Sequence, residues 1–171
     1  MLEEKIKIVD ENDEAVGGST LFEALQKGSY YDVVDIIIED EAGDILLQKR
    51  SSEKSSYPNC WTGTARGHVH QGETYERAAA REIRDELDLD MPLEYVGKVL
   101  VQAKTEDKTI NQFNTVFRGV ISRATKLTLN LPDSEARWFT REELNEKVMS
   151  APEEFAPAFV EIVEEFYMLE Q

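Results

Sequence analysis

Residues 67–89 read GHVHQGETYERAAAREIRDELDL. Its second half predicts a helix with Glu82, Asp85 and Glu86 on nearly the same face, because residues three and four apart are neighbours on a helix. Three crowded acids repel one another and do little to stabilise a helix. Carboxylates suit a hard cation such as Mg²⁺ or Mn²⁺, whereas an isolated run of this kind is usually a solvated acidic face.

The same helix has a clear start and a clear buried face. Thr74 is the expected N-cap, and Glu76 in the first turn is favoured by the helix dipole. Apolar residues recur at four-residue intervals, as a buried helix face requires. They are Tyr75, Ala79, Ile83 and Leu87. The acids lie beside this face, so we expect them at the edge of the core.

Composition limits the class of protein. The chain has 171 residues, 41% of them hydrophobic, which suits one domain with a sizeable core. No apolar run reaches the roughly 18 residues that span a bilayer, and no apolar signal segment is present. The one cysteine, Cys60, fits a reducing compartment. We therefore expect a cytoplasmic protein without a membrane partner.

The formal net charge of −16 argues against a nucleic-acid polymer as partner, because such binding needs a basic surface. It does not argue against a small phosphorylated molecule, since a bound divalent cation can reverse the local field.

Strands precede and follow the central helix. Runs that are rich in β-branched and aromatic residues, or that alternate polar and apolar, predict strands. They cover residues 5–10, 30–38, 44–49, 60–66, 93–102, 110–121 and 136–140. Further helices are expected at about 20–26, at 141–148 and at 156–169. This order predicts an α/β (α+β) fold with a mixed sheet flanked by helices on both faces.

The first 28 residues are interpreted as an N-terminal hairpin and short helix, an extension of the main domain at 29–171. The hairpin and the 156–169 helix are equally able to pack on their own domain or on a second copy, so a homodimer is open.

The central stretch resembles the Nudix box. That pattern is Gly, five residues, Glu, seven residues, then Arg-Glu-apolar-any-Glu-Glu-any-Gly-apolar. Gly67 and Glu73 occupy the first two positions, and residues 81–89 occupy the rest. Asp85 stands where the family usually has Glu, and Asp88 where it usually has Gly. Asp85 has a shorter reach, and Asp tolerates positive φ better than most residues, so neither departure removes the site.

The resemblance implies a Nudix-type α/β/α sandwich and a Mg²⁺- or Mn²⁺-dependent hydrolase of a diphosphate bond. The implied metal ligands are Glu82, Asp85, Glu86 and the backbone carbonyl of Gly67. Glu82 and Glu86 are also the implied catalytic acids, and Gly67, Glu73 and Arg81 are the structural residues of the box. A fourth acid from outside the box often completes such sites. Glu135, just before the strand ARWFT, is the first candidate for this catalytic role, and Glu106 is the second.

The flanking sequence resembles the isopentenyl-diphosphate isomerase branch of this superfamily. The residues that carry this likeness are 10–17, 46–51, Lys54, Pro58, 61–62 and 67–68. An Arg and a Lys of that branch grip the substrate's diphosphate, which implies that Arg50 and Lys54 bind substrate. His68 matches an isomerase metal contact, but its partner histidines are missing, so we expect a hydrogen-bonded or solvated side chain.

The residues that isomerisation needs are absent. The isomerase cysteine directly precedes its Gly-His pair, where this chain has Arg66. Cys60 lies six residues earlier and is expected to be a small buried apolar residue. Tyr30 and Tyr31 replace histidines, and Gln112 replaces a glutamate. We therefore interpret the chain as an isomerase-like Nudix protein that hydrolyses a small-molecule diphosphate.

Two alternatives remain open. They are an isomerase-like enzyme and a non-catalytic ligand-sensing module. The loops at 50–59 and 103–108 carry no recognisable signature, so a nucleoside diphosphate derivative and a related organic diphosphate, such as a prenyl diphosphate, are both open as substrate.

Overall fold

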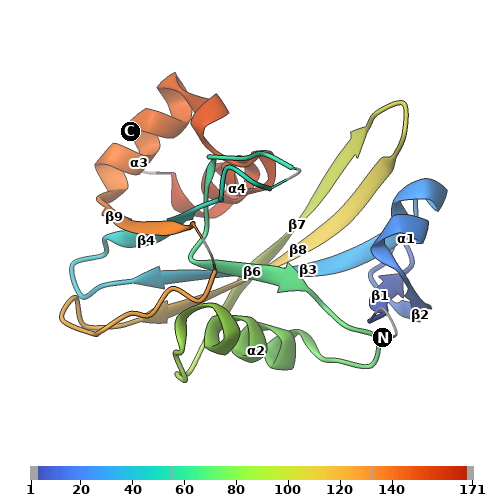
Figure 1. The fold of residues 1–171 in the computed structure, drawn as a ribbon, viewed down its shortest axis with the longest axis horizontal. Coiled ribbons are helices and arrows are strands. Elements are labelled where there is room, and N and C mark those ends of the chain that lie inside the picture. The colour runs from blue at the N-terminus through green and yellow to red at the C-terminus, as the bar shows by residue number, and fades with distance from the viewer. Residues whose placement is uncertain (1–3, 55, 132, 169–171) are drawn as a thin grey trace.

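The computed structural model describes residues 4–54, 56–131 and 133–168. In these residues, nine strands form one mixed sheet with helices on both faces (Figure 1). The strands are β1 (Ile6–Val9), β2 (Ala15–Ser19), β3 (Tyr30–Glu39), β4 (Ile45–Lys49), β5 (Trp61–Thr62), β6 (Ala65–His68), β7 (Glu94–Lys104), β8 (Thr109–Val120) and β9 (Glu135–Phe139). The helices are α1 (Leu21–Lys27), α2 (Tyr75–Leu87), α3 (Arg141–Ser150) and α4 (Pro157–Ile162), with a 3-10 turn η1 (Pro152–Glu154) and a π-helical segment η2 (Val163–Tyr167).

Strand β3 organises the sheet. It pairs in parallel with β8 along its whole length, and antiparallel with β1, β6 and β4 along its other edge. Strand β8 forms a long antiparallel hairpin with β7, and β4 also pairs with β5 and β9. The mixed sheet predicted from the sequence is confirmed.

Each face of the sheet buries its own core, because successive side chains of a strand point to opposite faces. On one face, Val34, Ile36 and Ile38 of β3 pack with residues of α2. On the other face, Ile37 packs with residues of α3 and α4, among them Leu144. Figure 1 shows α2 on one side of the sheet and α3 and α4 on the other. The predicted α/β/α sandwich is confirmed.

Two predicted elements differ from the structure. The single strand predicted at 60–66 is wrong, since β5 and β6 are separate. Between them, Thr64 Oγ1 donates to the Leu46 carbonyl at 2.6 Å and accepts from the Ile38 N–H at 2.8 Å. The side chain thus takes the place of ladder hydrogen bonds. The helix predicted at 156–169 is α4 followed by η2, and its last position lies outside the described residues.

The N-terminal segment joins the main sheet. Thr20 caps α1 by accepting from the Glu23 N–H, and Gly28 ends the helix at φ 69°. Strand β1 pairs with the start of β3, and Ile6 packs in one buried cluster with Tyr31. The division into an extension and a domain at residue 28 stays a proposal.

No helix in the described part of the chain is long and apolar enough to cross a bilayer.

Candidate active site

The loop before α2 is tied to the helix by Arg81. Thr74 Oγ1 accepts from the Arg77 N–H at 3.2 Å, which confirms the predicted N-cap. Glu73 accepts two hydrogen bonds from Arg81, at 2.8 and 2.9 Å, and Arg81 also donates to the His68 carbonyl at 3.0 Å. Burial acts to raise the pKa of Glu73, but the Arg81 hydrogen bonds prevail and hold it below its ordinary value. Arg81 therefore joins the loop, β6 and α2.

At the C-terminal end of α2, Asp88 takes the position at which the family usually has glycine. Asp88 adopts the left-handed conformation at φ 53°, as expected for an Asp at this position. Asn130 donates from its side chain to the Asp85 carbonyl at 2.9 Å and to Asp88 Oδ1 at 3.2 Å. Its backbone N–H donates to the Glu86 carbonyl at 2.9 Å. The carbonyls left unpaired at the helix end are thus satisfied by a residue from a distant loop.

Gly67 permits a close approach between Glu82 and the β6 backbone. A Cβ at position 67 would lie 2.1 Å from Glu82 Oε1, a distance that real Cβ atoms do not show. Glu82 also accepts a hydrogen bond from Arg81. Burial raises the pKa of Glu82, and the charge of Asp85 adds to this effect, whereas Arg81 opposes it.

Glu86 lies one turn of α2 after Glu82, and it contacts the same part of the β6 backbone. Its Oε2 accepts from the Arg66 N–H at 3.3 Å. Burial, followed by the charge of Glu82, raises the pKa of Glu86 to about 8. Two partly buried carboxylates are therefore held together against residues 66–67, where they repel each other.

The donor set suits a hard divalent cation, which would relieve this repulsion. The structure brings Glu82 and Glu86 together, whereas Asp85 is exposed. Across residues 4–54, 56–131 and 133–168, no group of three or more His, Cys, Asp or Glu side chains is arranged to hold a metal ion. Two carboxylates and the backbone at Gly67 are thus the groups available for the expected metal.

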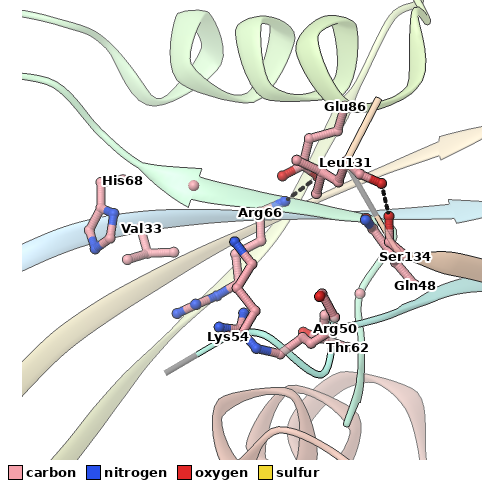
Figure 2. A pocket seen from close by; sticks show the side chains of 13 residues that line it. Val33, Gln48, Arg50, Lys54, Thr62, Arg66, His68, Glu86, Leu131 and Ser134 are labelled. Atoms are coloured by element: carbon pink, nitrogen blue, oxygen red, sulfur yellow. Dashed lines mark hydrogen bonds between the residues drawn. The ribbon is translucent and has the colours of Figure 1, made fainter. Parts of the chain in front are cut away.

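A cavity of about 280 Å³ opens beside Glu86 (Figure 2). It is lined by Val33, Gln48, Arg50, Ser51, Lys54, Thr62, Gly63, Arg66, Gly67, His68, Glu86, Leu131 and Ser134. Figure 2 shows the side chains of Arg50, Lys54 and Arg66 gathered on one side of β6, while Glu86 enters from α2 on the other. Arg50 donates from Nε to the Ser56 carbonyl at 3.0 Å. The cavity is therefore lined by both expected substrate-binding residues and by two of the expected metal ligands, Gly67 and Glu86.

Other expected site residues lie elsewhere. Glu135 does not line the cavity but forms an ion pair with Lys49 at 3.7 Å, and its side chain is 62% exposed. Glu106 lies in the exposed turn between β7 and β8. The catalytic role of either acid stays a prediction. The expectation of a buried Cys60 is wrong, because Cys60 follows a surface loop and is only partly buried, and its Sγ donates to the Glu153 carbonyl at 3.6 Å.

His68 lines the cavity with a neutral ring. Burial, then the positive charge of Arg66, lowers its pKa to about 4. Its ring lies against Tyr31, with the ring centroids 5.8 Å apart.

Three residues of the site region were missed by the sequence interpretation. Arg66 was considered only as the residue that replaces a cysteine, yet it lines the cavity and its Nε lies 3.4 Å from Asp35 Oδ1. Asp35 is fully buried in β3 and accepts from Asn114 Nδ2 at 2.6 Å. The available signal was an aspartate within the apolar run VVDIII, since a buried charge needs a partner.

Comparisons with known proteins agree with this architecture. The family model described as the NUDIX domain matches residues 30–159. The chain is 28% identical over 164 residues to isopentenyl-diphosphate Delta-isomerase 2 of Photorhabdus laumondii, an alignment that covers 95% of this chain and 92% of that protein. It is 30% identical over 158 residues to an uncharacterized Nudix hydrolase of Listeria monocytogenes, covering 91% and 90%. A crystal structure of a Deinococcus radiodurans protein superposes with a TM-score of 0.76 at 26% identity, covering 96% and 99%. The chain belongs to the Nudix family.

Proposed function

We propose that this protein is a divalent-metal-dependent hydrolase that cleaves the diphosphate bond of a small organic diphosphate. The observation that carries the proposal is the pairing of opposite charges across one cavity. Arg50 and Lys54 lie on one side, and Glu86, with Glu82 beside it, lies on the other. Cations attract the phosphates, and acids can hold the metal that the family typically uses.

Glu82, Glu86 and the Gly67 carbonyl would hold the metal, and Asp85 would add its negative charge. A bound Mg²⁺ or Mn²⁺ neutralises phosphate charge and lowers the pKa of water. Arg50 offers planar two-point contact with phosphate oxygens, and Lys54 supplies a mobile charge. Together they hold the diphosphate so that its reacting phosphorus lies toward Glu86.

In the overall reaction, an oxygen of water bonds to phosphorus and the bridging P–O bond breaks. The proton released by water needs a base. The raised pKa of Glu86 belongs to the site without a cation, and a bound divalent cation would favour its carboxylate form, which is the form that can hold the metal or accept a proton. Glu135 is the proposed base from outside the box. The Glu135 side chain would have to leave its ion pair with Lys49 to reach the cavity.

The test is phosphate release from nucleoside diphosphate derivatives, dinucleoside polyphosphates and prenyl diphosphates, with Mg²⁺ and with Mn²⁺. Glu86→Gln should lower turnover by orders of magnitude while the fold is retained. Glu76→Gln, an exposed acid on the same helix, is the matched control and should keep full turnover. Turnover that survives Glu86→Gln would refute the role given to Glu86.

An isomerase is the second candidate, because relatives that cover nearly the whole chain carry that name. The cavity argues against it. Arg66 occupies the expected cysteine position, and Cys60 does not line the cavity. Incubation with isopentenyl diphosphate distinguishes the two. Formation of the allylic isomer without phosphate release would favour the isomerase, and phosphate release would favour the hydrolase.

A further inference from the structure

Arg66 lies between the acidic side chain of Glu86 and the cationic side chains of the cavity. Its backbone N–H donates to Glu86, and its side chain enters the cavity beside Arg50 and Lys54 (Figure 2). The side chain is 26% exposed, so the guanidinium is accessible from the cavity. One residue thus connects the acid to the cationic side of the cavity.

A series of buried hydrogen bonds leads to this arginine from the first residues of β3, through side chains of β8. The Tyr31 hydroxyl donates to Gln112 Oε1 at 3.0 Å, and Gln112 Nε2 donates to Asn114 Oδ1 at 2.8 Å. Asn114 then donates to Asp35 at 2.6 Å, and Asp35 pairs with Arg66 at 3.4 Å. Tyr31, Gln112, Asn114 and Asp35 are all buried. Every donor in this series of hydrogen bonds has an acceptor. The series ends on the Asp35 carboxylate, which forms its ion pair with Arg66.

The backbone sets the same arrangement. Asp35 and Arg66 are direct partners in the antiparallel pairing of β3 with β6. Opposite charges at such positions attract across the strands. Arg66 uses Nε for Asp35, and its two terminal nitrogens make no hydrogen bond to any residue that the structure describes. A guanidinium has five N–H donors, so those on the terminal nitrogens remain available to a ligand.

The three positively charged side chains that line the cavity favour the binding of an anion. Burial, together with the charge of Arg66, lowers the pKa of Arg50, so two cations are held close enough to repel each other. Within the described residues, Lys54 forms no ion pair, although its positive charge acts on Glu86 across the cavity. In a chain with a net charge of −16, such a concentration of positive charge in one cavity is selective for a multiply charged anion.

We propose that Arg66 is a substrate-binding residue whose guanidinium holds a phosphate of the diphosphate, and that Asp35 is its positioning residue. Asp35 fixes the plane of the guanidinium from behind, which leaves its outer edge for two-point contact with phosphate oxygens. Because the backbone of Arg66 holds Glu86, the phosphate and the acid are placed relative to each other by a single residue. The inference deepens the proposed function and takes its ligand class from it.

Binding of methylenediphosphonate, a diphosphate analogue that water does not cleave, tests the inference by calorimetry with Mg²⁺ present. Arg66→Gln should weaken binding at least about tenfold, as expected for lost hydrogen bonds between charged groups. Arg66→Lys should recover part of the affinity, since it keeps the charge and loses the planar contact. Arg77→Gln, an exposed arginine on α2, should bind like the wild type. Unchanged affinity in Arg66→Gln would overturn the inference.

The positioning role of Asp35 needs a readout that a general loss of structure would not give. Asp35→Asn should weaken binding in the wild-type background and cause no further loss in the Arg66→Gln background. Equal losses in both backgrounds would overturn this role. Arg66→Gln alone leaves a buried carboxylate unpaired and can unfold the protein, so the double variant Asp35→Asn/Arg66→Gln, which removes both charges, supplies the binding measurement in that case.

The binding assay separates this inference from the proposed hydrolysis. If the wild type releases no phosphate from any tested compound but binds the analogue through Arg66, the inference stands and the hydrolase proposal fails. If the wild type hydrolyses a diphosphate and Arg66→Gln binds the analogue as tightly, the hydrolase proposal stands and the inference fails.

Discussion

At the scale of single residues, Gly67 is needed for space rather than for backbone freedom. Its φ is not positive, unlike that of Gly28 or Gly72. The Glu82 carboxylate occupies the volume in which a side chain at position 67 would lie. This contact brings a charged group against the backbone next to Arg66, so the glycine determines how closely the acids of α2 approach the cavity.

Gly67→Ala should therefore displace Glu82 and destabilise the fold by about 1–3 kcal/mol, as overpacking typically does. Urea unfolding measures the effect. In the background of Glu82→Ala, which removes the clashing carboxylate, the same substitution should cost less than about 1 kcal/mol. An equal cost in the two backgrounds would show that the contact with Glu82 is not the reason for the glycine.

At the scale of elements, α2 is held at both ends by residues outside it. Arg81 reaches back to Glu73 in the preceding loop, and Asn130 reaches the last turn from the segment before β9. Helix propensity alone does not set the position of a helix of 13 residues. These contacts fix its rotation and its depth over β6, and so they determine where Glu82 and Glu86 point.

The Glu73–Arg81 pair gives a pH-dependent prediction. The folded-state pKa of Glu73 lies below the ordinary value of 4.5, so its stabilising effect is present above pH 4.5 and is lost as the pH falls through the folded-state pKa. Glu73→Gln should lower the unfolding free energy by about 1.5–3 kcal/mol at pH 7. The difference from wild type should shrink below pH 4.5.

Urea titrations at pH 7, 5.5 and 3.5 provide the measurement. Glu146→Gln, an exposed acid on α3, is the control and should differ from wild type by less than about 0.5 kcal/mol throughout. A difference between Glu73→Gln and wild type that stays constant down to pH 3.5 would contradict the pKa argument.

At the scale of the whole molecule, a polar cluster around Tyr75 connects the turn of the N-terminal hairpin to the rest of the fold. The Tyr75 hydroxyl lies 2.8 Å from Asp13 Oδ2, in the hairpin turn, and 3.1 Å from Asp32 Oδ2, in β3. Lys7 and Lys98 each lie over the Tyr75 ring, and each pairs with one of the two aspartates. The cluster therefore joins β1, β3, β7 and α2.

Tyr75→Phe removes the hydroxyl and leaves the buried Asp32 carboxylate with fewer partners. We expect a loss of about 1–3 kcal/mol in unfolding free energy, with faster amide exchange at residues 10–14 than in wild type. Tyr95→Phe, at a tyrosine that is 58% exposed, is the matched control and should be nearly neutral. Unchanged exchange at residues 10–14 in Tyr75→Phe would mean that the hairpin is held by other contacts.

Local patterns predicted much of the fold. The four-residue spacing and the Thr74 cap identified α2, and β-branched runs identified most strands, because these signals act between residues close in the chain. The break between β5 and β6 was not predicted. The Thr64 hydroxyl at this break forms hydrogen bonds with β3 and β4, which are distant from it in the sequence. The placement of Glu135 escaped it as well, since its partner Lys49 is set by the pairing of β4 with β9.

The sequence by itself determined the family, the helix that carries the acids and the cations of the 50–54 region, because these depend on residue types at short, regular spacings. Only the tertiary structure decided that Arg66 shares a cavity with Arg50 and Lys54, and that a carboxylate stands behind it. Asp35 and Asn114 are 79 residues apart and meet through the parallel pairing of β3 with β8, while Arg66 arrives on the opposite edge of β3. Strand register is a property of the whole sheet, and no local spacing in the chain specifies it.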